Sequence, residues 1–205
     1  MRRGREEFRV ARIPLTGRLV ERQSCDSDLV GGFGADAARR LAVGWALAAR
    51  SRQTLVYFPI APEVTRDGRL RNPLPEGRSD APNVDLLLVP RGRLRPSRWP
   101  EIRSRLGPGT PTTIDLPEDA FQVTEEASER ADRLSATRHA RTLIVTGTGA
   151  AFADSLGPLT TLAEDLPAAA ARHPEQFHVS ELVLDRAVGQ GLFLYLAPHG
   201  GVLAS

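Results

Sequence analysis

Long apolar runs, separated by alanine-rich and proline-rich stretches, set the pattern of this 205-residue chain. Two of the runs, QTLVYFPI (53–60) and NVDLLLVP (83–90), are almost continuously apolar. Such runs are typical of strands that are buried on both faces. TTIDL (112–116), RTLIVTG (141–147), HVSELVLD (178–185) and GLFLYLAPHGG (191–201) predict four more strands. The pattern therefore predicts a sheet that other elements cover.

Helical spacing follows or precedes several of these runs. Residues 36–50 carry a few large apolar side chains among many alanines, which favours a helix packed closely against a sheet. A short helix is predicted over 99–106, another from a cap at Thr124 to Leu134, and a fourth over 159–171. Strands and helices alternate over 110–180, which predicts an α/β fold with a layered sheet flanked by helices.

The chain length fits one domain with a sizeable core. Residues 1–22 form an arginine-rich segment that we expect to add one edge strand, over 8–13 or 17–20. Residues 23–205 are predicted to form a single α/β domain. Within it, the stretch 61–83 is rich in proline and glycine, which predicts a long loop or lid.

The amino-acid composition of the chain excludes several kinds of catalytic and binding chemistry. All 27 basic residues are arginine, which indicates a GC-rich, actinobacterial genome and excludes a Schiff-base lysine, a pyridoxal-phosphate anchor and a phosphate-loop lysine. Cys25 is the only cysteine and lies beside two aspartates, so neither a disulfide nor a thiol nucleophile is expected. The four histidines form no metal-binding pair, so we expect no metal. No apolar run has the length of a membrane span, and we expect a cytoplasmic protein.

The arginines are unevenly placed, although the formal net charge is only +2. They concentrate in residues 1–22 and in PRGRLRPSRWPEIRSR (90–105), around Trp99. Arginines beside an aromatic side chain can hold nucleic acid. Because the rest of the chain balances the charge, we expect a solvated face instead and no nucleic-acid partner.

A glycine-rich turn with dinucleotide-like spacing opens the first helix: Gly32, Gly34 and Ala37 in GGFGADA. A dinucleotide site also needs a strong strand before the turn and an acidic residue at the tip of the next strand. The preceding ERQSCDSD is polar and the next strand ends in proline. These glycines are therefore interpreted as a helix start.

The segment LIVTGTGAAF (143–152) resembles the strand and turn of the crotonase superfamily, the enoyl-CoA hydratases and isomerases. TTIDL (112–116) with the following helix, and LYLAPHGGVLAS (194–205), are similar in layout to other parts of that fold. The resemblance covers residues 111–205 and implies a shortened or degenerate crotonase-like half-fold, with the N-terminal strand and helix as an addition.

The resemblance implies an oxyanion hole for an acyl thioester, with a coenzyme A thioester as substrate and no resident cofactor. Carried over, the residues that would bind the acyl group or its carbonyl are Gly147, Gly149, Ser155, Gly200 and Gly201. Asp154 or His199 would move the proton. The implied protein is a homo-oligomer that acts on or binds the thioester as a hydratase, isomerase or hydrolase, or supports a partner enzyme, in a tailoring or accessory role in bacterial secondary metabolism.

A second resemblance falls on the same residues. FADSLGPLTTL (152–162) is similar to the FxDSxGxxxL segment of STAS domains, the anti-sigma-factor antagonist fold. It implies a regulatory protein without catalysis, switched by phosphorylation of Ser155. The sequence leaves both alternatives open.

Overall fold

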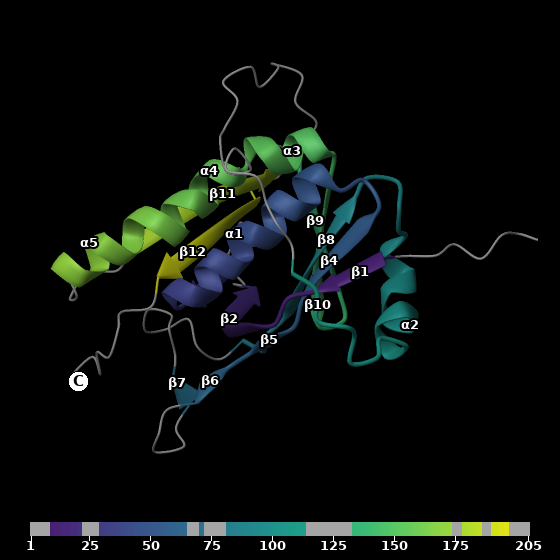
Figure 1. Ribbon diagram of the computed structural model, residues 1–205, viewed down its shortest axis with the longest axis horizontal. Helices are drawn as coiled ribbons and strands as arrows, with labels where there is room; N and C mark the ends of the chain where they lie inside the picture. Colours follow the sequence, from purple (N-terminus) through teal and green to yellow (C-terminus); the bar gives the residue numbers. More distant parts are fainter. Residues whose placement is uncertain are drawn as a thin grey trace, which may run out of the picture.

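The computed structural model describes residues 9–21, 29–64, 70–71, 81–113, 133–173, 178–185 and 190–196. It shows an α/β protein with two five-stranded mixed sheets and a few helices (Figure 1). The α/β class predicted from the sequence is therefore confirmed.

The first sheet has the strand order β1, β4, β8, β10, β9. The bounds are β1 Arg9–Arg12, β4 Thr54–Phe58, β8 Asp85–Pro90, β10 Thr142–Gly147 and β9 Ser135–His139. β1 pairs in parallel with β4, and β8 with β10, whereas β4 with β8 and β10 with β9 are antiparallel. β1 and β9 are the edge strands of this sheet.

The second sheet has the order β11, β12, β3, β2, β5. The bounds are β11 His178–Asp185, β12 Gln190–Leu196, β3 Leu29–Phe33, β2 Leu15–Glu21 and β5 Ile60–Ala61. Two short strands, β6 Glu63–Val64 and β7 Leu70–Arg71, pair with each other. Part of the stretch 61–83, which was predicted as a long loop, therefore forms two paired strands.

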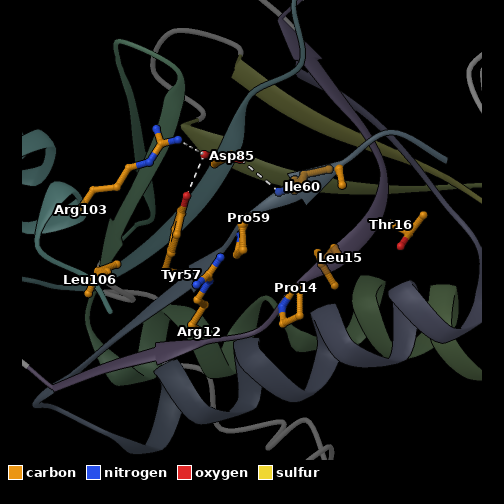
Figure 2. Close-up of a pocket in the computed structure, with 11 residues that line it drawn as sticks. Arg12, Pro14, Leu15, Thr16, Tyr57, Pro59, Ile60, Asp85, Arg103 and Leu106 are labelled. Carbon is orange, nitrogen blue, oxygen red and sulfur yellow. Dashed lines mark hydrogen bonds and ion pairs between the residues drawn. The ribbon is translucent and has the colours of Figure 1, made fainter. Parts of the chain in front are cut away.

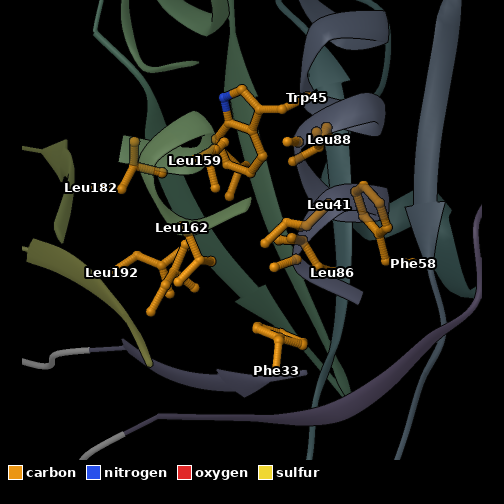
Figure 3. Close-up of a cluster of buried hydrophobic side chains, with 14 of the residues drawn as sticks. Phe33, Leu41, Trp45, Phe58, Leu86, Leu88, Leu159, Leu162, Leu182 and Leu192 are labelled. Atoms are coloured by element: carbon orange, nitrogen blue, oxygen red, sulfur yellow. The ribbon is translucent and has the colours of Figure 1, made fainter. Parts of the chain in front are cut away.

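Two helical segments lie side by side and contact both sheets (Figure 1). One is α1, Ala35–Arg50; the other is a run of α3 Gly149–Asp154, α4 Leu156–Thr160, a π-helical turn η3 Thr161–Asp165 and α5 Leu166–Arg172. A single core cluster combines side chains from α1, from this run and from both sheets (Figure 3). Burial of this shared apolar surface joins the two sheets into one body.

A separate, smaller cluster lies on the other face of the first sheet. There the turn η1 Pro96–Arg98 and helix α2 Trp99–Ser104 cover β4, β8 and β10. Successive strand residues point to opposite faces. Val56 and Phe58 therefore belong to the main core, while Leu55 and Tyr57 pack with Trp99. Cover on both faces explains why these strands are apolar throughout.

Most predicted elements that fall on described residues are present. Besides β6 and β7, two described strands, β3 and β9, were not predicted. β3 contains Gly31 and Gly32, and its sequence was interpreted as the approach to a helix rather than as a strand. β9 is polar and mostly exposed, so its sequence has no alternation of apolar residues that would predict a strand. The predicted strand at 112–116 and helix from Thr124 fall largely outside the described residues. None of the described helices is long and apolar enough to cross a membrane.

Candidate binding pocket

A buried carboxylate at the start of β8 gathers three donors. Asp85 Oδ2 accepts a hydrogen bond from the Tyr57 hydroxyl at 2.8 Å and lies 3.1 Å from Nη2 of Arg103. Asp85 Oδ1 accepts a hydrogen bond from the backbone N–H of Ile60 at 3.0 Å. Asp85 is only 6% exposed. Because burying an ionised carboxylate is costly unless its oxygens are bonded, these donors explain how the protein holds one here.

Two chain segments cross from the first sheet to the second beside this carboxylate. The segment of β1 and β2 runs parallel to the segment of β4 and β5, and Leu15 N donates to Pro59 O at 3.0 Å between the strands. Pro14 and Pro59 stand at the crossing, and neither has an N–H to donate to a ladder. Asp85 of β8 adds a side-chain acceptor here, for the Ile60 N–H.

Asn83, two residues before Asp85, forms hydrogen bonds to both of the crossing segments. Its Oδ1 accepts from Leu19 N at 2.7 Å, and its Nδ2 donates to Ile60 O at 3.1 Å. Both backbone polar groups of Ile60 are therefore satisfied by side chains, the C=O by Asn83 and the N–H by Asp85. This accounting explains why the apolar run NVDLLLVP (83–90) contains the polar residues Asn83 and Asp85 near its start.

Helix α2 delivers Arg103 to the carboxylate. Trp99 is 1% exposed, and its Nε1 donates to Thr142 Oγ1 at 3.1 Å. Its ring meets the Tyr57 ring edge-on, with centroids 5.0 Å apart. Residues four apart lie on one face of a helix, so the anchored Trp99 fixes where Arg103 points. The Arg103 guanidinium carbon lies 5.9 Å from the centroid of the Tyr57 ring.

Tyr57 is held in its neutral form. Burial, reinforced by the hydrogen bond to Asp85 and by its negative charge, raises the pKa of Tyr57 to about 12. The positive charges of Arg103 and Arg12 act in the opposite direction and are outweighed. At neutral pH the phenol is therefore a fixed hydrogen-bond donor and does not act as a base.

An open pocket of about 460 Å³ adjoins this cluster (Figure 2). We call it the crossing pocket. Its lining residues come from both crossing segments, from β8 and from α2 and the residues after it: Arg12, Pro14, Leu15, Thr16, Tyr57, Pro59, Ile60, Ala61, Asp85, Arg103 and Leu106. Small-molecule sites commonly have this size and this mixture of apolar walls with a few polar groups.

The charges of the crossing pocket do not balance. Two guanidinium groups line it, from Arg12 and Arg103, against the single carboxylate of Asp85. Asp85 already accepts from three donors, and Arg103 is one of them. The Arg12 side chain is exposed and forms no ion pair or hydrogen bond with the part of the chain that the structure describes. Figure 2 shows Arg12 and Arg103 on either side of Tyr57.

The site residues implied by the sequence resemblances lie elsewhere. Gly147 ends β10, and Thr148 caps α3 by accepting from Ala151 N at 3.2 Å. A Cβ at Gly149 would lie 2.5 Å from Ala49 O, so this glycine lets α3 approach the end of α1. Gly149 therefore has a packing role, and acyl binding by this turn stays a prediction.

Asp154 and Ser155 are half-buried at the junction of α3 and α4. Ser155 Oγ accepts from Trp45 Nε1 at 2.9 Å and donates to Phe152 O at 2.9 Å. His199, Gly200 and Gly201 lie outside the described residues, as does Cys25.

The glycine turn and the crossing pocket are at opposite ends of the same strands. Thr142 pairs with Asp85 at one end of β10 and β8, and Gly147 pairs with Pro90 at the other. Five residue steps at about 3.3 Å each separate these ends by about 16 Å. One small ligand could therefore not use both.

The sequence alone did not point to the four polar side chains of the crossing pocket that carry this chemistry: Arg12, Tyr57, Asp85 and Arg103. One signal was present: Asp85 is a carboxylate inside a run that otherwise predicts a strand buried on both faces. A buried acidic residue requires partners, but the sequence does not say which ones.

No family model, curated protein or solved structure matches this chain. Among the described residues, no group of three or more His, Cys, Asp or Glu side chains is arranged to hold a metal ion. Function must therefore be inferred from the chemistry of the pocket.

Proposed function

We propose that this protein binds a small organic anion in the crossing pocket. The observation that carries the proposal is the charge of the lining: two guanidinium groups face a pocket whose one carboxylate already accepts from three donors. An anionic ligand would supply the missing negative charge.

The anionic group is proposed to sit between Arg12 and Arg103. Guanidinium groups bind carboxylate and phosphate through short, charge-assisted hydrogen bonds. The Arg103 side chain is 37% exposed, so it has N–H groups available beyond its contact with Asp85. Arg12 is exposed on the edge strand β1 and needs no rearrangement of the core to reach a ligand.

The rest of the ligand is proposed to be apolar. Leu15 and Ile60 are buried side chains that also line the pocket, and Leu106 lines it near Arg103. Apolar contact stabilises a bound ligand by about 25 cal/mol for each Å² removed from water. A carboxylic acid or phosphate ester with a short hydrocarbon body fits this combination.

Binding rather than catalysis is the proposed activity of the crossing pocket. General base catalysis requires a group whose pKa lies near the working pH. The phenol of Tyr57 has a pKa of about 12, and its proton is engaged by Asp85. The Tyr57 hydroxyl would orient Asp85, and the guanidinium groups of Arg12 and Arg103 would bind the ligand.

Thermal unfolding with matched pairs of compounds tests this proposal. Each pair would be an organic acid and its neutral amide, since the two differ mainly in charge. A ligand selective for the folded state raises the melting temperature, so the acids should raise it and the amides should not. The Arg12→Ala variant should lose the response, while Arg9→Ala, at the other end of β1, should keep it. Failure of every acid to shift the wild-type transition would contradict the proposal.

A second candidate is acyl-thioester binding at the glycine turn. It is supported by the local layout: β10 runs through Gly147 into a capped helix, which is the strand, turn and helix that the crotonase resemblance implies. In this proposal the N–H groups near Gly149 hold the thioester carbonyl, and Asp154 moves a proton.

A panel of acyl-CoA thioesters with free coenzyme A as the control separates the two candidates. Stabilisation by thioesters that is retained in Arg12→Ala would favour the glycine turn. Stabilisation that is lost in Arg12→Ala would place the anionic part of the ligand in the crossing pocket.

A further inference from the structure

The crossing pocket differs in chemistry from one end to the other. Figure 2 shows Arg103 toward one end of the pocket, Arg12 beside Tyr57, and Thr16 at the opposite end. The lining residues of the crossing segments that separate Arg12 from Thr16 are all apolar: Pro14, Leu15, Pro59 and Ile60. A charged end, an apolar middle and an uncharged polar end therefore follow one another.

Alternation along the two crossing segments places the lining residues on one face. Successive strand residues point to opposite faces. Every second residue of the crossing belongs to the main core: Ile13, Leu15, Phe58 and Ile60. The residues that alternate with them lie on the other face and line the pocket: Arg12, Pro14, Thr16, Tyr57, Pro59 and Ala61. Tyr57 is on the face of the first sheet that α2 covers, so α2 brings Arg103 to the same side.

Strand register fixes the distance between the two ends. Arg12 pairs with Tyr57, and Thr16 pairs with Ala61. Between these pairs, the hydrogen bond from Leu15 N to Pro59 O keeps the two segments side by side through the crossing. Four residue steps of about 3.3 Å separate Arg12 from Thr16 by about 13 Å along the segment.

The Thr16 hydroxyl is available to a ligand. Thr16 and its partner Ala61 are exposed, and the Thr16 side chain forms no hydrogen bond with any residue that the structure describes. A hydroxyl can both donate and accept. A polar ligand group that reaches this end therefore gains a hydrogen bond without breaking one within the described part of the protein.

We propose that the crossing pocket takes an unbranched carboxylic acid that carries a hydroxyl group at its far end, with Thr16 as the residue that selects it. The inference rests on the proposed function, because the carboxylate would occupy the anion site between Arg12 and Arg103. The chain would cross Pro14 and Pro59, and the hydroxyl would meet Thr16. An extended chain with bonds of about 1.5 Å and angles of about 111° advances about 1.25 Å per bond, so a span of about 13 Å takes about ten carbon atoms.

The lining disfavours two related classes of acid. In a shorter hydroxy acid, the hydroxyl would lie against Pro14 and Pro59, which have no N–H to donate to it. In a diacid, the second carboxylate would lie beside Thr16 and Ala61, and neither carries a charge that compensates for its lost hydration. The matched hydroxy acid avoids both costs.

Isothermal titration of the full chain with two series of probes tests this inference. One series is the straight-chain acids from butanoic to dodecanoic acid, and the other is the same acids with a hydroxyl on the last carbon. The plain acids should bind up to about fourfold more tightly with each added methylene, until the chain reaches the exposed end of the pocket. Each short hydroxy acid should bind more weakly than its plain counterpart. At about ten carbon atoms the order should reverse, with an advantage of about two- to tenfold from one hydrogen bond to Thr16.

Substitutions of Thr16 separate the hydroxyl from the shape of the side chain. Valine keeps the β-branched shape that suits a strand and lacks the hydroxyl. Thr16→Val should therefore remove the advantage of the matched hydroxy acid over the plain acid of the same length, and Thr16→Ser should keep it. Thr137→Val is the matched control, because Thr137 is an exposed threonine of β9 outside the pocket, and this variant should also keep the advantage.

Failure of this inference is distinguishable from failure of the proposed function. If the acids bind and Arg12→Ala weakens all of them, but hydroxy acids of every length bind no better than plain acids, the anion site stands and the role of Thr16 is overturned. An undiminished advantage in Thr16→Val, or tighter binding of the matched diacid than of the hydroxy acid, would also overturn it. Absence of binding by every acid would overturn both.

Discussion

The hydroxyl of Tyr57 donates a 2.8 Å hydrogen bond to Asp85 at the point where the two sheets meet. Both residues are less than 10% exposed. The same carboxylate accepts from the Ile60 N–H and contacts Arg103 of α2. One buried charge thus connects β4, β5, β8 and α2, and it also forms a wall of the crossing pocket.

The first prediction concerns alkaline pH. An unfolded tyrosine ionises near pH 10, whereas the pKa of Tyr57 in the folded protein is about 12. The folded state keeps this proton between those values, so its contribution to stability is fully present below about pH 10 and is lost as the pH rises through about 12. Urea unfolding at a series of pH values should show a decline on the order of 2 kcal/mol across this window.

Tyr57→Phe is the matched control for this decline, because it keeps the ring that packs on Trp99 and removes the ionising group. The Tyr57→Phe variant should show a smaller decline than the wild type. In a Tyr195→Phe background Tyr57 is the only tyrosine, and the absorbance of its phenolate should appear near pH 12. A midpoint near pH 10 in the folded protein would contradict the described environment.

The second prediction concerns Asp85→Asn. The amide keeps one acceptor oxygen, but its NH₂ group cannot accept from a donor, so at least one of the three donors loses its partner. Leaving a buried donor unsatisfied costs about 1 to 3 kcal/mol of stability. Asp36→Asn is the control, because Asp36 and Arg40 form an exposed pair across one helical turn and such a pair contributes less than about 1 kcal/mol. Equal effects of the two substitutions on the free energy of unfolding would contradict the role given to Asp85.

Asp85→Asn has a second expected effect, on binding. Removing the carboxylate makes the lining of the crossing pocket more positive and releases Arg103. If the folded variant is compared with wild type under the same buffer, its affinity for an organic acid should rise or stay unchanged. A large loss of affinity would show that Asp85 itself holds the ligand.

The third prediction concerns Ser155. Its hydroxyl satisfies the indole N–H of Trp45, which is completely buried, and so connects α1 to the run of α3 to α5. Ser155→Ala should cost about 1 to 3 kcal/mol, because it leaves that N–H without its acceptor. Ser104→Ala removes an exposed hydroxyl on α2 and should change stability by less than about 0.5 kcal/mol.

The Ser155 result also bears on the regulatory alternative. Phosphorylation would place about two negative charges where the hydroxyl now contacts Trp45 and Phe152. The phosphorylated protein is therefore expected to melt at a lower temperature than the unmodified one. Phosphate incorporation by a partner kinase without any change in melting would show that this contact is dispensable.

The fourth prediction concerns Gly149. Its added Cβ would meet a backbone oxygen of Ala49 at 2.5 Å, and backbone cannot move aside as a flexible side chain can. Gly149→Ala should therefore destabilise the protein by about 1 to 3 kcal/mol, even though alanine favours helices. Gly92→Ser is a useful comparison, since Gly92 has open space around it but a φ of +78°. A neutral Gly149→Ala would contradict the close packing of α3 on α1.

The sequence predicted those parts of the fold in which burial leaves a clear pattern. β4, β8 and β10 are apolar on both faces because α1 and α3 cover one face and α2 the other, so these strands form clear apolar runs in the sequence. β9 is mostly exposed and pairs on one side only, and its polar sequence carries no comparable signal. β3 buries all five residues, but its glycines resembled a turn.

The candidate sites show the same difference between local and long-range information. The turn around Gly147 and Gly149 is formed by consecutive residues, so sequence inspection could find it. The crossing pocket requires Arg12, Tyr57 and Arg103 to meet Asp85, and these residues are brought together by strand pairing and by the packing of Trp99. No spacing rule connects them, and only Asp85 stood out as a charge in an apolar run.

The most direct test of the central claim is isothermal titration of the wild-type protein and of Arg12→Ala with the organic acid that stabilises the fold most. The wild type should bind one equivalent of the acid and should not bind its neutral amide. Arg12→Ala should bind at least about tenfold more weakly, corresponding to a loss of about 1.4 kcal/mol or more. Equal affinity of both proteins for the acid, or equal affinity of the wild type for acid and amide, would contradict an anion site in the crossing pocket.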